Sequence, residues 1–313
     1  ILDSERGNSP VIIMNSEFLV CLADKMATHL GPEVLRTLRF AASDEWRETL
    51  EQSSFTWKGS DPEKWKGFGR LWRDGGHYNA SIILDGSVSK YVIETTVPTP
   101  IAAGNLAAAL EFAIGNPIRV GVESQSQFTA FVSIQIKERP HSDTFPPLRI
   151  DNYKPKGNLT PLSIDGLEFG KKGGIRRFGQ NYCSVPIRLF DHWERASTSL
   201  ASIADSQDKT TWEKSMCTAV STAFVESGEL VFIENEQSWE QVGSQYLSRW
   251  GFGKIEHILA SQDSLSFAVK SDANPCMVAG LLMGCMHRGM GKNIYPEWEI
   301  IDDTTSIRFD MTR

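Results

Sequence analysis

NPCMVAGLLMGCMHRGMGKNIYPEWEI, which runs from Asn274 to Ile300, has the pattern of a helix, then a turn, then a strand. Small residues recur on one face of the helical part, which ends at Gly289 and Gly291. A second stretch with the same plan, PTPIAAGNLAAALEFAIGNPIRVGV, runs from Pro98 to Val122. A constant offset of 176 residues aligns Gly104 with Gly280, Ala108 with Gly284, Gly115 with Gly291, and Ile118 with Ile294. We infer that one structural unit is used twice.

The repeat extends over most of the chain. Three more pairs of segments align at offsets of 174 or 176 residues: SVSKYVIE (87–94) with DSLSFAVK (263–270), WKGFG (65–69) with WEQVG (239–243), and SPVIIMNSEFL (9–19) with CSVPIRLFDHW (183–193). The sequence therefore predicts two similar tandem units, residues 1–140 and 181–313, joined by a Pro- and Gly-rich linker at 141–180. The alternative is two unrelated domains that share the same order of helix, glycine and strand.

Both units show the same order of helical and strand patterns. In the first unit we expect helices over 17–30, 32–51, 62–72 and 101–114, and strands over 78–84, 90–95, 118–124 and 128–137. In the second unit we expect helices over 190–204, 209–226, 237–249 and 275–288, and strands within 254–270, 295–300 and 305–311. Strands and helices do not alternate strictly, so we predict an α+β fold with a few helices on an antiparallel sheet in each unit. Because Gly280 and Gly284 are small residues on one face of their helix, we expect this helix to pack closely against the sheet.

The composition of the chain argues against some classes of function and partner. The 313 residues are 41% hydrophobic and carry a formal net charge of −7. This acidic balance argues against a nucleic-acid partner, which needs clustered Lys and Arg. The one basic run, KKGGIRR at 171–177, is expected to be a solvated part of the linker. Five cysteines without CxxC spacing favour reduced thiols in the cytoplasm, and no apolar run is long enough to span a membrane.

The sequence offers no catalytic motif. GMGK at 289–292 lacks the rest of a phosphate-binding loop, and its glycines end a helix instead of opening one. Neither GxSxG nor HExxH occurs, and the six histidines have no ligand spacing. We therefore name no catalytic residue and no metal ligand.

Aromatic residues are the best candidates for a binding site. They bracket the Gly-rich step and the strand pair in each unit, close to polar residues such as His77 and Asn79. Rings with a few polar groups are typical of small-molecule pockets, although packing in a hydrophobic core explains them as well. The candidate ligand-binding residues are Trp72, Tyr91, Trp250, Phe252, His257, Phe267 and Cys276.

Two segments of the second unit carry a resemblance to a known family: YLSRWGFGKIE (246–256) and LSFAVKSDANPCMVAGLLMGCMHRGMGKNI (265–294). Their order, a Gly-containing step, a strand, and then Cys-x-x-x-Gly-x-x-x-Gly before an acidic strand, resembles the 4-vinyl reductase domain. That domain occurs in bacteriochlorophyll biosynthesis and as the sensor module of aromatic-responsive transcription activators, and it is distantly related in fold to membrane-trafficking TRAPP subunits. The resemblance implies binding of a small molecule.

The chain departs from that family at its zinc site. Sensor members use cysteines that follow the Gly-rich helix, whereas KNIYPEWEIIDDTTSIRFDMTR, at 292–313, contains none. A tetrahedral zinc site needs four ligands, and Cys276 alone cannot supply them. We therefore predict no zinc and no other cofactor.

The leading functional hypothesis is a non-catalytic sensing or regulatory protein that binds a small apolar or aromatic molecule. Its two units are expected to pack as an intramolecular pseudo-dimer, with an output domain or protein partner outside this chain. One alternative is a protein-interaction scaffold whose ligand sites have degenerated. Another is an enzyme acting on a tetrapyrrole-like substrate, which only the resemblance to the family supports.

Overall fold

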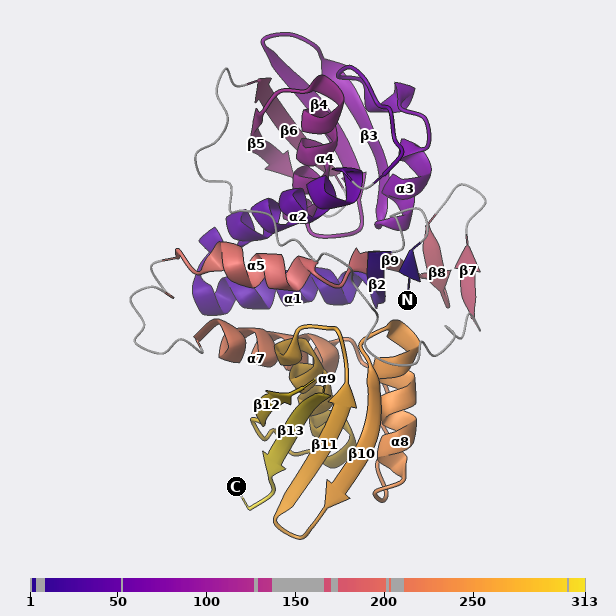
Figure 1. Cartoon of the computed structure of the whole chain (residues 1–313), viewed down its shortest axis with the longest axis vertical. Coiled ribbons are helices and arrows are strands. Elements are labelled where there is room, and N and C mark those ends of the chain that lie inside the picture. The colour runs from indigo at the N-terminus through magenta and orange to yellow at the C-terminus, as the bar shows by residue number, and fades with distance from the viewer. Residues whose placement is uncertain are drawn as a thin grey trace.

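The computed structural model describes residues 2–3, 9–51, 53–126, 129–136, 166–169, 174–200, 203, 211–302 and 304–312. Within these ranges the chain forms an α+β fold with three antiparallel sheets, which confirms the predicted class. Figure 1 shows one four-stranded sheet at each end of the molecule and a layer of helices between them. The third sheet lies beside that helical layer.

The first four-stranded sheet belongs to the first unit. Its strands run in the order β3-β4-β6-β5, with bounds β3 His77–Leu84, β4 Val88–Thr95, β5 Ile118–Gln125 and β6 Thr129–Ile136. The helical elements of this unit are α1 Ser16–Leu30, α2 Glu33–Glu51, η2 Pro62–Lys64, α3 Phe68–Asp74 and α4 Thr99–Ile114. Burial alternates along β4 and β6, as it does in a sheet with one face on a core. Tyr91 and Val132 point into that core.

The second four-stranded sheet has the same strand order relative to the chain. The order is β10-β11-β13-β12, with bounds β10 Lys254–Ala260, β11 Ser264–Lys270, β12 Glu297–Ile301 and β13 Thr304–Asp310. The helical elements are α5 Leu189–Ser197, α7 Thr211–Glu226, α8 Ser238–Val242, the π-helical η3 Gly243–Leu247, the 3-10 helix η4 Ser248–Trp250, and α9 Pro275–Met290. The equal order agrees with two similar units, and a common origin for them stays a prediction.

The third sheet joins the two units. Its order is β1-β2-β9-β8-β7, with bounds β1 Leu2–Asp3, β2 Ser9–Asn15, β7 Leu167–Phe169, β8 Ile175–Arg177 and β9 Gln180–Pro186. Both β7 and β8 fall within the predicted linker, whose residues 141–165 and 170–173 lie outside the described ranges. Part of the predicted linker is therefore paired sheet.

The pairing of β2 with β9 is symmetric with respect to the repeat: when each residue is replaced by its repeat equivalent, one pair of the ladder becomes another pair of the same ladder. Val11 pairs with Pro186, and Ile12 pairs with Val185. An offset of 174 residues carries Val11 onto Val185 and Ile12 onto Pro186, so the first pair becomes the second. Such a register is the pattern of a two-fold, self-complementary contact.

The first helix of each unit packs on the second helix of the other unit. The main partner of α1 is α7, and the main partner of α5 is α2. Figure 1 shows α5 and α1 between α2 and α7. One hydrophobic cluster accordingly takes residues from both units, including Leu22 of α1 and Val220 of α7. The contact between the units is therefore part of the protein core.

Close helix crossings explain the aligned glycines. A Cβ atom on Gly104 of α4 would collide with the main-chain oxygen of Arg39 on α2. A Cβ atom on Gly280 of α9 would lie 2.6 Å from the main-chain oxygen of Cys217 on α7. Gly284 similarly faces Phe224 of α7. The prediction that these glycines face the sheet is wrong, because they face a helix, where backbones approach most closely without a side chain between them.

No helix among the described residues is both long enough and apolar enough to cross a membrane.

Candidate functional site

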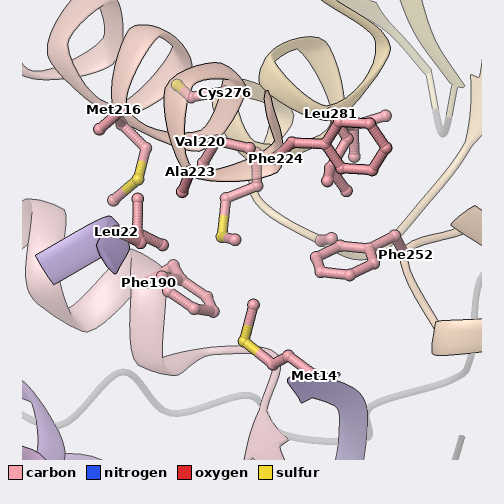
Figure 2. Packing of buried hydrophobic residues seen from close by; sticks show 14 of the residues in the cluster. Met14, Leu22, Phe190, Met216, Val220, Ala223, Phe224, Phe252, Cys276 and Leu281 are labelled. Atoms are coloured by element: carbon pink, nitrogen blue, oxygen red, sulfur yellow. The ribbon is translucent and has the colours of Figure 1, made fainter. Parts of the chain in front are cut away.

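Three of the predicted ligand residues of the second unit lie in the hydrophobic core. Phe252 and Cys276 are buried in the cluster of Figure 2, where apolar side chains of several helices meet. The Phe267 ring contacts the rings of Trp239 and Phe309, with centroid distances of 4.9 and 6.0 Å. Burial raises the pKa of the Cys276 thiol, and the nearby carboxylates of the same region add to this effect. These three side chains pack the core in the described structure.

The other two predicted residues of the second unit lie apart from them. His257 is exposed on β10, opposite Ala268 of β11. Trp250 ends η4, and its ring stacks on Tyr182 of β9 with a centroid distance of 5.3 Å. The structure therefore does not gather the five predicted residues of this unit around one cavity.

The first unit contains a continuous ladder of aromatic rings, which we call the aromatic ladder. Successive ring centroids along it lie 4.6, 5.3, 5.1, 4.9 and 4.1 Å apart. Its members in order are Phe55, Trp57, Trp65, Phe68, Trp72 and His77. Phe68 and Trp72 stack because they are four residues apart on one face of α3. Trp72, a predicted ligand residue, is thus in the ladder, next to His77.

Tyr91, the other predicted residue of this unit, has a different role. It is fully buried in the same hydrophobic cluster, and its hydroxyl donates a hydrogen bond of 2.8 Å to the Ser60 carbonyl oxygen. Desolvation, followed by the negative charges of Asp85 and Asp61, raises the pKa of Tyr91 to about 12. Its polar group is therefore satisfied within the protein, and its ring packs the core.

Two indole groups of the aromatic ladder have no hydrogen-bond acceptor among the described residues. Trp57 donates its Nε1–H to the Lys66 carbonyl oxygen at 2.9 Å. The Nε1 atoms of Trp65 and Trp72 are buried and unpaired. A buried donor without a partner costs about 1–3 kcal/mol, so such groups normally meet an acceptor, which is a protein atom, a water or a ligand.

The polar end of the aromatic ladder is held by His77, which is 1% exposed. Its Nδ1 lies 2.9 Å from Thr95 Oγ1, and its Nε2 lies 3.2 Å from Asn105 Nδ2. Because the amide nitrogen of Asn105 donates, Nε2 accepts and the ring proton belongs on Nδ1. His77 is therefore assigned as a neutral imidazole that links β3 to α4.

A small, mainly apolar cavity with three polar lining residues adjoins Asn105 where the two units meet. Its volume is about 10 Å³, which is room for about one water molecule. The lining residues are Leu19, Glu45, Gly75, Val97, Ile101, Asn105, Ser184, Val185, Pro186 and Leu189. The Oγ atom of Ser184, on β9 of the second unit, is buried and has no partner among the described residues. The cavity therefore lies between β9 of the second unit and Asn105, whose side chain contacts His77 of the aromatic ladder.

Two of the polar residues that line this cavity have apolar counterparts in the second unit. At the repeat offset, Glu45 aligns with Ala219 and Asn105 aligns with Leu281, and both aligned residues are buried and apolar. At these aligned positions the first unit therefore has polar residues and the second unit has apolar ones.

Sequence reasoning missed Trp65, Asn105 and Ser184 as site residues. One signal was available for the aromatic ladder, because three of the nine tryptophans, Trp57, Trp65 and Trp72, lie close together in the sequence. No local signal marks Asn105 or Ser184, since each becomes part of the cavity only through the packing of the two units.

Within the part of the chain that the structure describes, no group of three or more His, Cys, Asp or Glu side chains is placed to hold a metal ion. The chain matches no known family model, no curated protein and no solved structure.

Proposed function

We propose that the protein is a non-catalytic, regulatory protein that binds a small aromatic molecule at the aromatic ladder of the first unit. The observation that carries this proposal is the pair of buried indole donors of Trp65 and Trp72, which lie within a stack of rings and have no acceptor among the described residues. The rings offer apolar contact, and each indole N–H can donate a hydrogen bond to a ligand. Small-molecule sites usually combine apolar surfaces with a few polar groups in this way. The resemblance to a sensor-domain family adds support.

The ligand best matched to this site is a flat ring with one oxygen acceptor. The rings of the aromatic ladder are stacked, tilted or edge-to-face neighbours at 4.1 to 5.4 Å, so an added ring would join the same pattern. Because the adjoining cavity holds only about one water molecule, binding would require ladder side chains to move apart.

A regulatory role is supported by where the aromatic ladder ends. His77 contacts Asn105, and Asn105 lines the cavity that also contains Ser184 of the second unit. A shift of the ladder on binding would therefore reach the contact between the units. A ligand shifts such an equilibrium only as far as it binds one arrangement better than the other.

The test begins with native mass spectrometry of the purified protein beside its denatured mass. We expect an extra non-covalent mass of a few hundred daltons, as for a bound organic molecule. In a second step, phenol and benzene are compared as probes by thermal shift, because they differ only in the hydroxyl group, whose oxygen can accept a hydrogen bond from an indole. Phenol is expected to raise the melting temperature more than benzene does.

Two variants make this test specific. Trp72→Phe keeps the ring and removes the donor, so the advantage of phenol over benzene should shrink. Trp298→Phe, on β12 of the other unit, is the matched control and should keep that advantage in full. A purified protein with no extra mass, together with equal responses to phenol and benzene, would contradict the proposal.

A second candidate function is a protein-interaction scaffold. It is favoured by apolar side chains that the described sheets leave exposed, namely Ile83, Leu84, Val88, Phe131, Leu259, Ile300 and Ile301. Exposed apolar patches on soluble proteins often mark contact surfaces. Replacing Leu84 and Leu259 with Lys should leave the melting temperature unchanged and abolish co-purification of a partner from the source cell, if these faces are used.

A further inference from the structure

The turn between β8 and β9 carries an unusual combination of an exposed ring and an arginine. The Arg177 guanidinium lies 5.0 Å from the ring centroid of Phe178 and 5.0 Å from that of Trp250. Trp250 in turn stacks on Tyr182 and lies 5.3 Å from the guanidinium of Arg249. Arg177 is thus held between two aromatic rings, one exposed and one buried.

The backbone at this turn is strained. Arg177 pairs with Gln180, so Phe178 and Gly179 form a two-residue loop. Their φ angles are +50° and +80°, which is the conformation of a type I′ turn. Asn-Gly is the preferred sequence there, because an L-residue with a large side chain is disfavoured in the left-handed region. Backbone strain of this kind is often retained where it serves a function.

The strained residue also exposes its side chain. The Phe178 ring is 81% exposed, more than any other large apolar side chain among those described. Core packing therefore does not explain why a phenylalanine occupies this position. Aromatic and arginine side chains are enriched in the centres of protein–protein interfaces.

The charge of Arg177 is not neutralised by the described protein. No ion pair forms to this residue within the described ranges, and its buried Nε atom has no acceptor. Its neighbour Arg176 carries the same charge and lies opposite Glu168 in the register of β8 with β7. In the sequence the turn directly follows the basic run KKGGIRR, although the chain as a whole is acidic. A planar guanidinium held between rings is suited to bidentate contact with a carboxylate.

We propose that the β8–β9 turn is a docking point for an acidic segment of a partner protein. Arg177 would form an ion pair with a carboxylate of that segment, and Phe178 would pack against an adjacent apolar side chain. Charge complementarity selects the partner, because a tip that carries the neighbouring cations Arg176 and Arg177 attracts an acidic segment. The site does not involve the aromatic ladder, so it does not depend on the function proposed above.

The experiment uses the full chain and a fluorescein-labelled peptide of alternating Glu and Leu residues, followed by fluorescence anisotropy. A second peptide with Gln in place of Glu tests the need for carboxylates. We expect the acidic peptide to bind and the Gln peptide to bind at least about tenfold more weakly, since a charge-assisted hydrogen bond accounts for about that factor. Raising the salt concentration should weaken the binding of the acidic peptide.

Three variants locate the contact. Arg177→Gln and Phe178→Asn should each weaken binding about tenfold or more. Arg176→Gln removes the same charge next to them but leaves Arg177 and its two ring contacts in place, so it should change binding far less. Phe178→Asn should also raise the melting temperature, because Asn tolerates the left-handed region. That increase would show that its loss of binding does not come from unfolding.

Several outcomes would overturn the proposal. One is equal loss of affinity in Arg176→Gln and Arg177→Gln, which would mean that only total charge matters. Another is wild-type affinity in Arg177→Gln. A third is binding to phosphatidylserine vesicles without binding to the acidic peptide, which would assign the tip to a membrane surface.

Discussion

Trp193 of α5 donates its indole Nε1–H to the main-chain carbonyl oxygen of Val34 on α2, and the two atoms lie 3.0 Å apart. The two residues are 159 positions apart in the chain, and both are buried. A second hydrogen bond of 2.8 Å joins the hydroxyls of Thr37 and Ser197 across the same helices. The contact between the units is therefore fixed by specific polar groups as well as by apolar packing, and its energetics can be tested residue by residue.

The crossing of α4 over α2 should not tolerate a methyl group at its centre. Gly104→Ala is expected to lower the free energy of unfolding by about 1–3 kcal/mol, because the new Cβ collides with the main-chain oxygen of Arg39. Gly86→Ala is the control, since a Cβ there meets nothing within 4 Å, and its effect should be about 0.5 kcal/mol or less. Urea denaturation measures both. Equal stability of the two variants would contradict the close crossing.

The Arg188–Glu48 pair should contribute strongly to the contact between α5 and α2. The Nη1 and Oε2 atoms are 2.7 Å apart, and the side chains are only 18% and 13% exposed. Arg188→Met or Glu48→Gln alone is expected to cost about 3–5 kcal/mol, because each removes one side of a charge-assisted contact between largely buried groups. The double variant should cost less than the two single costs together, and a double-mutant cycle measures the difference.

An exposed ion pair provides the comparison. Arg36 and Glu33 are 60% and 64% exposed, so Glu33→Gln should change stability by roughly 0.2–1 kcal/mol. If the two pairs gave the same value, the Arg188–Glu48 pair would have to be accessible to water in solution.

His192 should make the protein less stable in mild acid. Desolvation, followed by the positive charges of Arg188 and Arg195, lowers the pKa of His192 to about 4. The ring is therefore neutral at pH 7, and its contact of 3.6 Å with Glu48 is not an ion pair at that pH. Between pH about 6.5 and about 4 the unfolded chain binds a proton that the folded protein does not. The free energy of unfolding must fall over that window, by roughly 3 kcal/mol at most.

The comparison of wild type with His192→Gln isolates this effect. Asp44, Asp191 and Glu194 have raised pKa values, mainly through desolvation, and they act in the opposite direction. Because both proteins keep these carboxyls, the difference between their stability curves reports His192. Curves that stay parallel from pH 7 to pH 4 would contradict this, because they would show that His192 has the same pKa in the folded and the unfolded protein.

The cysteines should react slowly with thiol reagents. Desolvation, followed by hydrogen bonding to Glu226, raises the pKa of Cys21 to about 11. Its thiolate fraction at pH 8 is then on the order of 0.1%. The other four cysteines are buried, and Cys285 has its pKa raised further by desolvation. Labelling with dithionitrobenzoate should therefore be slow, Cys21 should react first, and Glu226→Gln should accelerate it.

Local sequence signals predicted many of the elements. The helix expected over 275–288 is α9, Pro275–Met290, because Pro at its start and Gly291 at its end mark both boundaries. The Asp85-Gly86 turn likewise joins two strands of the first sheet. By contrast, β2 and β9 escaped prediction. Each is a short apolar segment whose partner lies far away in the chain, so no local pattern separates it from a helix or a connector.

The candidate site was predictable in its chemistry but not in its geometry. Trp72 and Tyr91 were both expected near a ligand, and both lie in the same hydrophobic cluster. Only the fold shows that the Tyr91 hydroxyl meets the Ser60 carbonyl oxygen while the Trp72 indole meets no acceptor among the described residues. Which donor is satisfied depends on main-chain atoms far away in the chain, and a sequence does not display their positions.

Because the first helix of each unit packs on the second helix of the other, each half of this chain completes the fold of the other half. The main packing partner of α1 is α7, and β2 pairs with β9. Cutting the backbone between β6 and β7 would sever the covalent link and leave these contacts intact. Two fragments expressed apart would therefore be expected to assemble on mixing, as in a split-protein complementation pair, and either fragment alone would lack the partner that completes its fold.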